Sequence, residues 1–220
     1  AANSIGGLKD LTPENLAVKL DALRSEDSAI AKSLEDFICS ELEKLNPNNH
    51  LSYLVEAGWS MCISLSRDVL FEVAIQNYHD SLPSSKSITI IDHPSVRPQS
   101  RTIPIYKLIG NLQNKDPGHS LALASSDILI RKSIWPNMLG TCSDHLRGNP
   151  LVFFGTDCSN ELAQQLLSNL AALPAPAPNS LFFLKDDPLL ADPTIRALCN
   201  SFSSVKVVDA TIREFANAVH

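Results

Sequence analysis

Residues 60–78 read SMCISLSRDVLFEVAIQNY, and they give the clearest indication of the fold class. The first six form an apolar run of strand length. The remainder, RDVLFEVAIQNY, has the mixture of apolar and polar side chains that is typical of an amphipathic helix. A strand that leads into a helix in this way predicts a unit of an α/β domain.

The same alternation continues to the C-terminus. Buried strands that alternate with helices imply right-handed βαβ units and a mostly parallel sheet covered on both faces. We therefore predict that residues 59–220 form a Rossmann-like α/β core, with a mostly parallel sheet flanked by helices. Two helix starts are marked by caps, at Asp192-Pro193 and at Thr211 with Glu214. The further runs are SITIID, TIPIYKLI, LVFFG, NELAQQLLSNLAAL, SLFFL, PTIRALCNSF, VKVVD and TIREFANAV.

Residues 1–58 are predicted to form a helical segment that packs on this core. Thr12 and Pro13 have the types expected at an N-cap and at the first helical position. A second helix is predicted after Ser25 and a short third helix over residues 50–57. With 220 residues and 44% hydrophobic content, the chain can bury one sizeable core, so we expect one compact domain.

Composition excludes several classes of partner. The formal net charge of -6 argues against a general nucleic-acid binder, which usually has a basic excess. No apolar run approaches the roughly 20 residues needed to span a bilayer, so we expect no membrane partner. The five scattered cysteines favour reduced thiols and a cytoplasmic location over a disulfide framework. The start, AANSIGGLKDL, lacks the features of a secretory signal, and we expect the sequence to be part of a longer protein.

Motifs for metal or nucleophilic chemistry are weak in this sequence. Cys142 and His145 are two possible metal ligands without an evident third, and a buried thiol beside a surface histidine explains them as well. Cys158 follows a predicted strand but has no histidine near it in sequence, which favours a structural thiol. The glycines of SIGGLKDL follow no strand, as a phosphate-binding loop would require. We expect no metal and no cofactor.

Several segments carry a family resemblance through their order and spacing. LSYLVEAGWSMCISLSRDVLFEVAI is a short helix, a strand and then a helix that opens near Asp68, and YKLIGNL is a strand that ends in glycine. SLALASSDILI, LVFFGTDCSNELAQQLL and VKVVDATIREFANAV follow. From roughly Leu51 to the C-terminus this layout resembles the sirtuin-like family, in the diverged form found in many bacterial multidomain proteins. The corresponding family motifs are of the types T-T-N-Y-D and K-L-H-G.

The resemblance implies an NAD-binding, Rossmann-type fold that has lost its chemistry. In active relatives the histidine before the glycine is the general base, and the asparagine helps to place the water or the ribose. Those positions are Ile109 and Ser66 here. Isoleucine cannot accept a proton, and serine lacks the paired donor and acceptor of an amide. We therefore expect no catalytic residue and a degenerate pseudoenzyme. The remnant pocket would comprise Ser66, Asp68, Ile109, Gly155, Thr156 and Asp157.

Three functions follow from this interpretation. The first is a non-catalytic scaffold for protein interaction, oligomerisation or docking within a larger protein, since such relatives are often fused to nuclease or nucleotide-hydrolysing modules in bacterial defence. The second is a sensor that binds NAD or ADP-ribose without turnover. The third is an NAD hydrolase with substituted residues, in which His93 replaces the base and Asp92 orients its ring.

Overall fold

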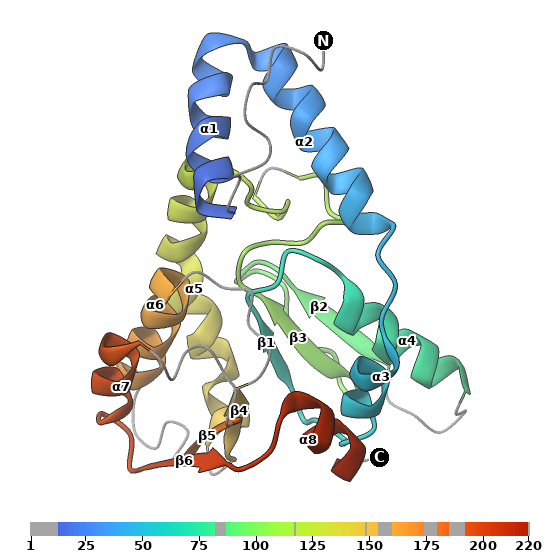
Figure 1. Ribbon diagram of the computed structural model, residues 1–220, viewed down its shortest axis with the longest axis vertical. Coiled ribbons are helices and arrows are strands. Elements are labelled where there is room, and N and C mark those ends of the chain that lie inside the picture. Colours follow the sequence, from blue (N-terminus) through green and yellow to red (C-terminus); the bar gives the residue numbers. More distant parts are fainter. Residues whose placement is uncertain are drawn as a thin grey trace.

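We describe the chain in a computed structural model, in residues 13–81, 87–116, 118–147, 149–153, 160–173, 180–184 and 192–219. These residues alternate between helices and short parallel strands, so the chain is mixed α/β, as predicted (Figure 1). No helix in this part of the chain has the length and apolar character to cross a bilayer. The elements are α1 (Pro13–Glu26), α2 (Ser28–Glu43), α3 (Asn49–Val55), β1 (Cys62–Ser64), α4 (Leu70–Ser81), β2 (Ile88–Ile91), β3 (Ile103–Lys107), α5 (Ser125–Leu146), β4 (Leu151–Phe153), α6 (Asn160–Ala171), β5 (Ser180–Leu184), α7 (Pro193–Cys199), β6 (Ser204–Val208) and α8 (Ile212–Val219).

The described part of the N-terminal quarter, from residue 13 on, is helical, as predicted; Thr12, the predicted N-cap, lies outside the described residues. Helix α1 begins at Pro13, where proline is favoured because its missing N–H would have no partner in the first helical turn. The break between α1 and α2 lies at Asp27, slightly after the predicted position. The Asp27 carboxylate accepts the backbone N–H groups of Ala29 (3.0 Å) and Ile30 (3.1 Å), and this cap starts α2.

An ionic cluster around Arg24 joins α1, α2 and α5. The Arg24 guanidinium donates to Glu35 Oε1 (2.7 Å) and, through its two terminal nitrogens, to both carboxylate oxygens of Asp127 (2.7 and 2.9 Å). Burial alone would raise the pKa of Asp127, but the hydrogen bonds from Arg24 and from the Ala124 backbone outweigh it and lower that pKa. The cluster therefore stabilises the contact between the helical segment and the core.

Replacing Asp127 with asparagine is expected to lower the free energy of unfolding by about 1–2 kcal/mol at neutral pH, since the bidentate pair is only partly screened by solvent. Because folding lowers the pKa of Asp127, its stabilisation is present above the ordinary aspartate range and is lost as pH falls through the folded-state value. Urea unfolding at several pH values measures this. The control Asp36→Asn breaks the exposed pair with Lys32 and should cost less than half as much. Equal losses for both variants would contradict the prediction.

Strands β1, β3 and β2 form a parallel sheet in that order, called sheet A here. Strand β3 lies in the middle, with Ile105 aligned with Cys62 of β1 and with Ile90 of β2. Ile105 packs with α3 and α4, whereas the next residue, Tyr106, belongs to the larger core that includes α5. Helices therefore cover both faces of sheet A, as the apolar character of its strands predicts.

Strands β4, β5 and β6 form a second parallel sheet, called sheet B here, with β5 in the middle. The rings of Phe153 and Phe183 stack on it with their centroids 4.8 Å apart. Buried leucines of α6 and Ile195 of α7 belong to the same core cluster as these rings. On the edge strand β6, Val205 and Val207 are 38% and 56% exposed.

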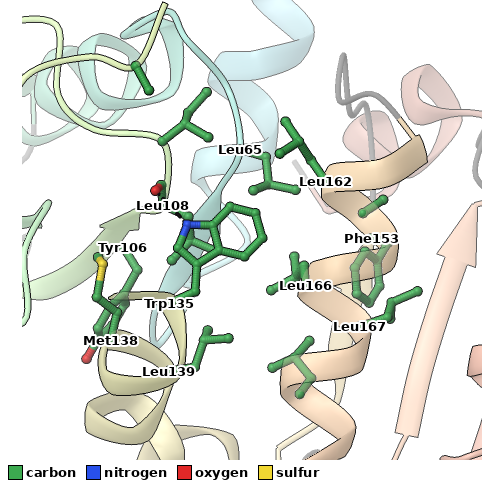
Figure 2. Close-up of a cluster of buried hydrophobic side chains, with 14 of the residues drawn as sticks. Leu65, Tyr106, Leu108, Trp135, Met138, Leu139, Phe153, Leu162, Leu166 and Leu167 are labelled. Carbon is green, nitrogen blue, oxygen red and sulfur yellow. Dashed lines mark hydrogen bonds between the residues drawn. The ribbon is translucent and has the colours of Figure 1, made fainter. Parts of the chain in front are cut away.

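The described residues form two sheets rather than the single Rossmann-like sheet that we predicted. In the described part of the chain, β1 and β4 are three residues long, and each pairs with one strand, β3 and β5 respectively. Figure 2 shows the contact that joins the two sheets: the indole of Trp135 lies beside Leu65, which follows β1, and Leu166 of α6. Trp135 is fully buried, and within the described residues it belongs to the hydrophobic cluster that joins sheet A to sheet B.

Candidate functional site

The loop after β1 carries Ser66 and Asp68, two of the predicted pocket positions. Ser66 Oγ donates to Asp68 Oδ2 (2.5 Å), and Asp68 Oδ1 accepts the backbone N–H of Leu70, the first residue of α4 (3.0 Å). Both carboxylate oxygens of Asp68 are thus used within the loop and at the helix start. This arrangement orders the chain between β1 and α4.

Lys107, at the end of β3, is fully buried, and the sequence interpretation gave it no role. Its ammonium donates to the backbone carbonyl of Asp68 (2.6 Å) and pairs with Glu72 Oε1 (2.7 Å). The Glu72 side chain is only 11% exposed. This buried ion pair brings the turn after β3 against the Ser66–Asp68 loop, so these parts of the predicted pocket do lie together.

Ile109 and Gly110 form the turn that follows β3. Ile109 is fully buried in the larger hydrophobic core, and its carbonyl accepts the N–H of Ala122 (2.8 Å). Gly110 has a φ of 93°, in the left-handed region that favours glycine. The position that the sequence resemblance assigns to a general base is therefore occupied by a packed apolar side chain, which cannot transfer a proton.

The structure describes only some of the remaining candidate residues. Gly155, Thr156, Asp157 and Cys158 lie outside the described residues. Cys142 is buried in α5, where its thiol donates to the carbonyl of Leu139 (3.1 Å) and burial raises its pKa to about 12. Within the described ranges, no group of three or more histidine, cysteine, aspartate or glutamate residues could hold a metal ion.

A histidine–aspartate pair that the sequence interpretation missed lies beyond β2. Asp92 is 3% exposed, and its Oδ1 lies 2.7 Å from His119 Nδ1. Its Oδ2 accepts the side-chain amide of Asn114 (3.2 Å). The suggestion that Asp92 orients His93 is therefore wrong: Asp92 orients His119, and the His93 ring lies against the His119 ring with centroids 4.7 Å apart. Only folding of the loop after β3 brings the two histidines together.

Arg131 of α5 is bonded to the backbone on both sides of the Asp92–His119 pair. It is 3% exposed, and it donates to the backbone carbonyls of Asp92 and Ser120, each at 2.6 Å. Burial lowers the pKa of its guanidinium, partly offset by the charges of Asp92 and Asp127. The guanidinium thus connects the segment after β2 with the segment after β3.

Two surface hollows lie near these elements. One of about 530 Å³ is lined by the loop after β2, including Arg97, and by Asn137 and Thr141 of α5. The other, of about 370 Å³, lies between α1, α5 and α6 and is lined by Val18, Leu129 and other residues of these helices. Prolines lie among the polar side chains of the first hollow, and the second combines apolar side chains with charged ones such as Lys132 and Glu161.

Neither the known protein-family models nor the curated proteins contain a match to this chain. The sirtuin-like resemblance therefore stays a prediction, carried by the motifs quoted above. The geometry near those motifs is nevertheless specific: Ile109 is buried, Asp68 is bonded within its loop, and Lys107 is paired. These contacts, together with large apolar side chains that are exposed on α1, α2 and α5, are the basis for a functional proposal.

Proposed function

We propose that this chain is a non-catalytic sirtuin-like module, with a Rossmann-type core, that acts in protein interaction or assembly within a larger protein. The observation that carries the proposal is the surface of α1, α2 and α5. In the described part of the chain, the four most exposed large hydrophobic residues all lie on these helices. They are Leu129 (70%), Ile130 (65%), Val18 (63%) and Phe37 (60%), and together with Ile30 (47%) we call them the apolar arm.

The arrangement of the apolar arm supports a docking role. Val18 and Leu129 line the same hollow, so apolar atoms of α1 and α5 meet at one place. Ile30 and Phe37 are two turns apart on α2 and therefore lie on the same side of that helix. Figure 1 shows α1 and α2 at the end of the molecule away from the sheets. Large apolar side chains exposed to water favour burial against another protein.

The burial of Ile109, at the position expected for a general base, supports the non-catalytic part of the proposal. A general base must accept a proton within hydrogen-bond reach of the reacting group. Ile109 cannot do so, and its full burial indicates that the position contributes to packing. Asp68 and Lys107 are bound to neighbouring groups, which favours a structural role for both.

Light scattering across a concentration series tests the assembly role. The unmodified chain is expected to self-associate or to retain a protein partner from its native host. Phe37→Ser and Leu129→Ser should each weaken that association at least about tenfold, because each removes a large apolar contact. The matched control is Val207→Ser, which changes a residue of comparable exposure (56%) on β6, outside the apolar arm.

A chain that stays monomeric and retains no partner would contradict the proposal, as would equal effects of all three variants. Two further measurements address the other functions. Heat on mixing with NAD or ADP-ribose would favour the sensor. Release of nicotinamide from NAD that disappears in His119→Gln would identify a hydrolase in which the Asp92–His119 pair supplies the base.

A further inference from the structure

The proposed assembly role does not involve His93 and His119, the two neighbouring histidines beside sheet A. Asp92 directly follows β2, and His119 lies in the loop that follows β3. These two strands are parallel neighbours, so both residues lie at the carboxyl edge of the sheet. Open α/β sheets bind their ligands at that edge. The His119 side chain is 23% exposed, so it is accessible to a small ligand.

Hydrogen bonds assign the proton positions on the two imidazoles. The backbone N–H of Ser95 can only donate, and it points to His93 Nδ1 (3.2 Å). In neutral His93 the proton therefore lies on Nε2, which is a donor. The buried Asp92 carboxylate accepts from His119 Nδ1 (2.7 Å), so the Nε2 of neutral His119 is an acceptor. One donor and one acceptor are thus held on adjacent rings.

We propose that His93 and His119 together bind the phosphate group of a monoester or free inorganic phosphate. Near neutral pH such a group, with its second pKa of about 6, offers an ionised oxygen and can share one proton with a neighbouring base. The ionised oxygen accepts from His93 Nε2, and the shared proton lies between a second oxygen and His119 Nε2. The ring centroids are 4.7 Å apart with the planes tilted by 38°, and the proposal places one phosphate against both of these neighbouring imidazoles.

The surrounding contacts place these rings before any ligand arrives. Both oxygens of Asp92 are hydrogen-bonded, one to His119 and one to Asn114. The backbone of Asp92 is fixed by Arg131, whose buried positive charge offsets the negative charge of the Asp92 carboxylate. Less ordering is then required on binding, which strengthens the interaction of a small ligand.

Histidine-ring NMR during titration near pH 6.5 tests the proposal, with inorganic phosphate, AMP and NAD as separate ligands. Phosphate and AMP are expected to shift the His93 and His119 resonances with millimolar affinity. NAD, whose two phosphates each have one ester and one anhydride bond and therefore no second ionisable proton, should bind at least about tenfold more weakly. His119→Gln and His93→Gln should each weaken phosphate binding about tenfold or more. His145→Gln removes a histidine from the far end of α5 and should leave it unchanged. Thermal unfolding verifies that each variant is folded.

Binding of phosphate alone would assign the site to the free ion, and binding of AMP as well would extend it to nucleotides; either supports the proposal. No shift with either ligand would overturn it, as would equal binding of NAD or equal losses in all three variants. The site and the apolar arm lie on different elements. Failure of phosphate binding therefore leaves the assembly proposal intact, and apolar-arm variants should still bind phosphate.

Discussion

Replacing Lys107 with alanine is expected to lower the free energy of unfolding by about 3–5 kcal/mol. The change leaves the Glu72 carboxylate buried without its cation and the Asp68 carbonyl without its donor. Since a domain of this kind is stabilised by only about 5–15 kcal/mol in total, a large share of its stability would be lost. Urea or thermal unfolding measures the effect.

A paired substitution separates the effect of the two charges from the effect of the volume that their side chains fill. Lys107→Met combined with Glu72→Leu replaces both charges with apolar groups, and it should recover most of the loss. The control Lys32→Ala removes an exposed partner of Asp36 and should cost less than about 1 kcal/mol. If Lys107→Ala costs no more than Lys32→Ala, the buried pair is not a principal contact of this region.

Gly110→Ala is expected to be comparably severe, at about 3–5 kcal/mol, because several costs coincide. The φ of 93° strains any residue with a Cβ atom. That atom would lie 2.1 Å from the carbonyl oxygen of Ser120 and 2.5 Å from Nη2 of Arg131. The Ser120 contact is with backbone, so a side-chain rotation cannot relieve it, and the hydrogen bond from buried Arg131 to that carbonyl would be lost.

Two other glycines isolate these costs. Gly58 has a φ of 69° with open space around it, so Gly58→Ala should cost only the backbone strain, about 1–2 kcal/mol. Gly140 lies within α5 in open space, and Gly140→Ala should stabilise the chain by about 0.5–1 kcal/mol. The unfolding temperature should therefore be much lower for Gly110→Ala than for Gly58→Ala, and it should be highest for Gly140→Ala. A Gly110→Ala variant as stable as Gly58→Ala would contradict the close approach described here.

Local signals predicted much of the secondary structure. Asp192 caps α7 through the N–H of Thr194 (2.7 Å), as its position before proline indicates. Thr211 and Glu214 form the expected reciprocal pair at the start of α8, with bonds of 2.8 and 3.2 Å. Such motifs are readable because both partners lie within a few residues of each other in the sequence.

Helix α5 is an element that such local signals did not predict. Its 22 residues were not predicted as a helix, since Pro136 and Gly140 lie inside it. Apolar residues also occur on its exposed side, as at Leu129, which obscures the helical period. Tertiary packing outweighs these local penalties, because Trp135 and Met138 are fully buried in the core. The packing of sheet A against sheet B likewise depends on side chains that are far apart in the sequence, so no short stretch predicts it.

The candidate site was predictable only in part. A buried isoleucine before Gly110 followed from the apolar character of the β3 segment. The Asp92–His119 pair did not, since it spans 27 residues and depends on the turns that follow β3. Charge pairs such as Lys107–Glu72 also escape prediction, because a lysine at a strand end is usually solvated.

The hydrogen bond from Trp135 Nε1 to the carbonyl of Leu108 (2.8 Å) gives the protein an intrinsic optical probe. The chain has two tryptophans, and Trp135 is the fully buried one, in contact with residues of both halves of the core. Its fluorescence therefore depends on the polarity where the sheet A and sheet B parts of the core meet. It also depends on whether the turn that begins at Leu108 keeps its hydrogen bond to the indole. Loosening of either half would change the same emission band.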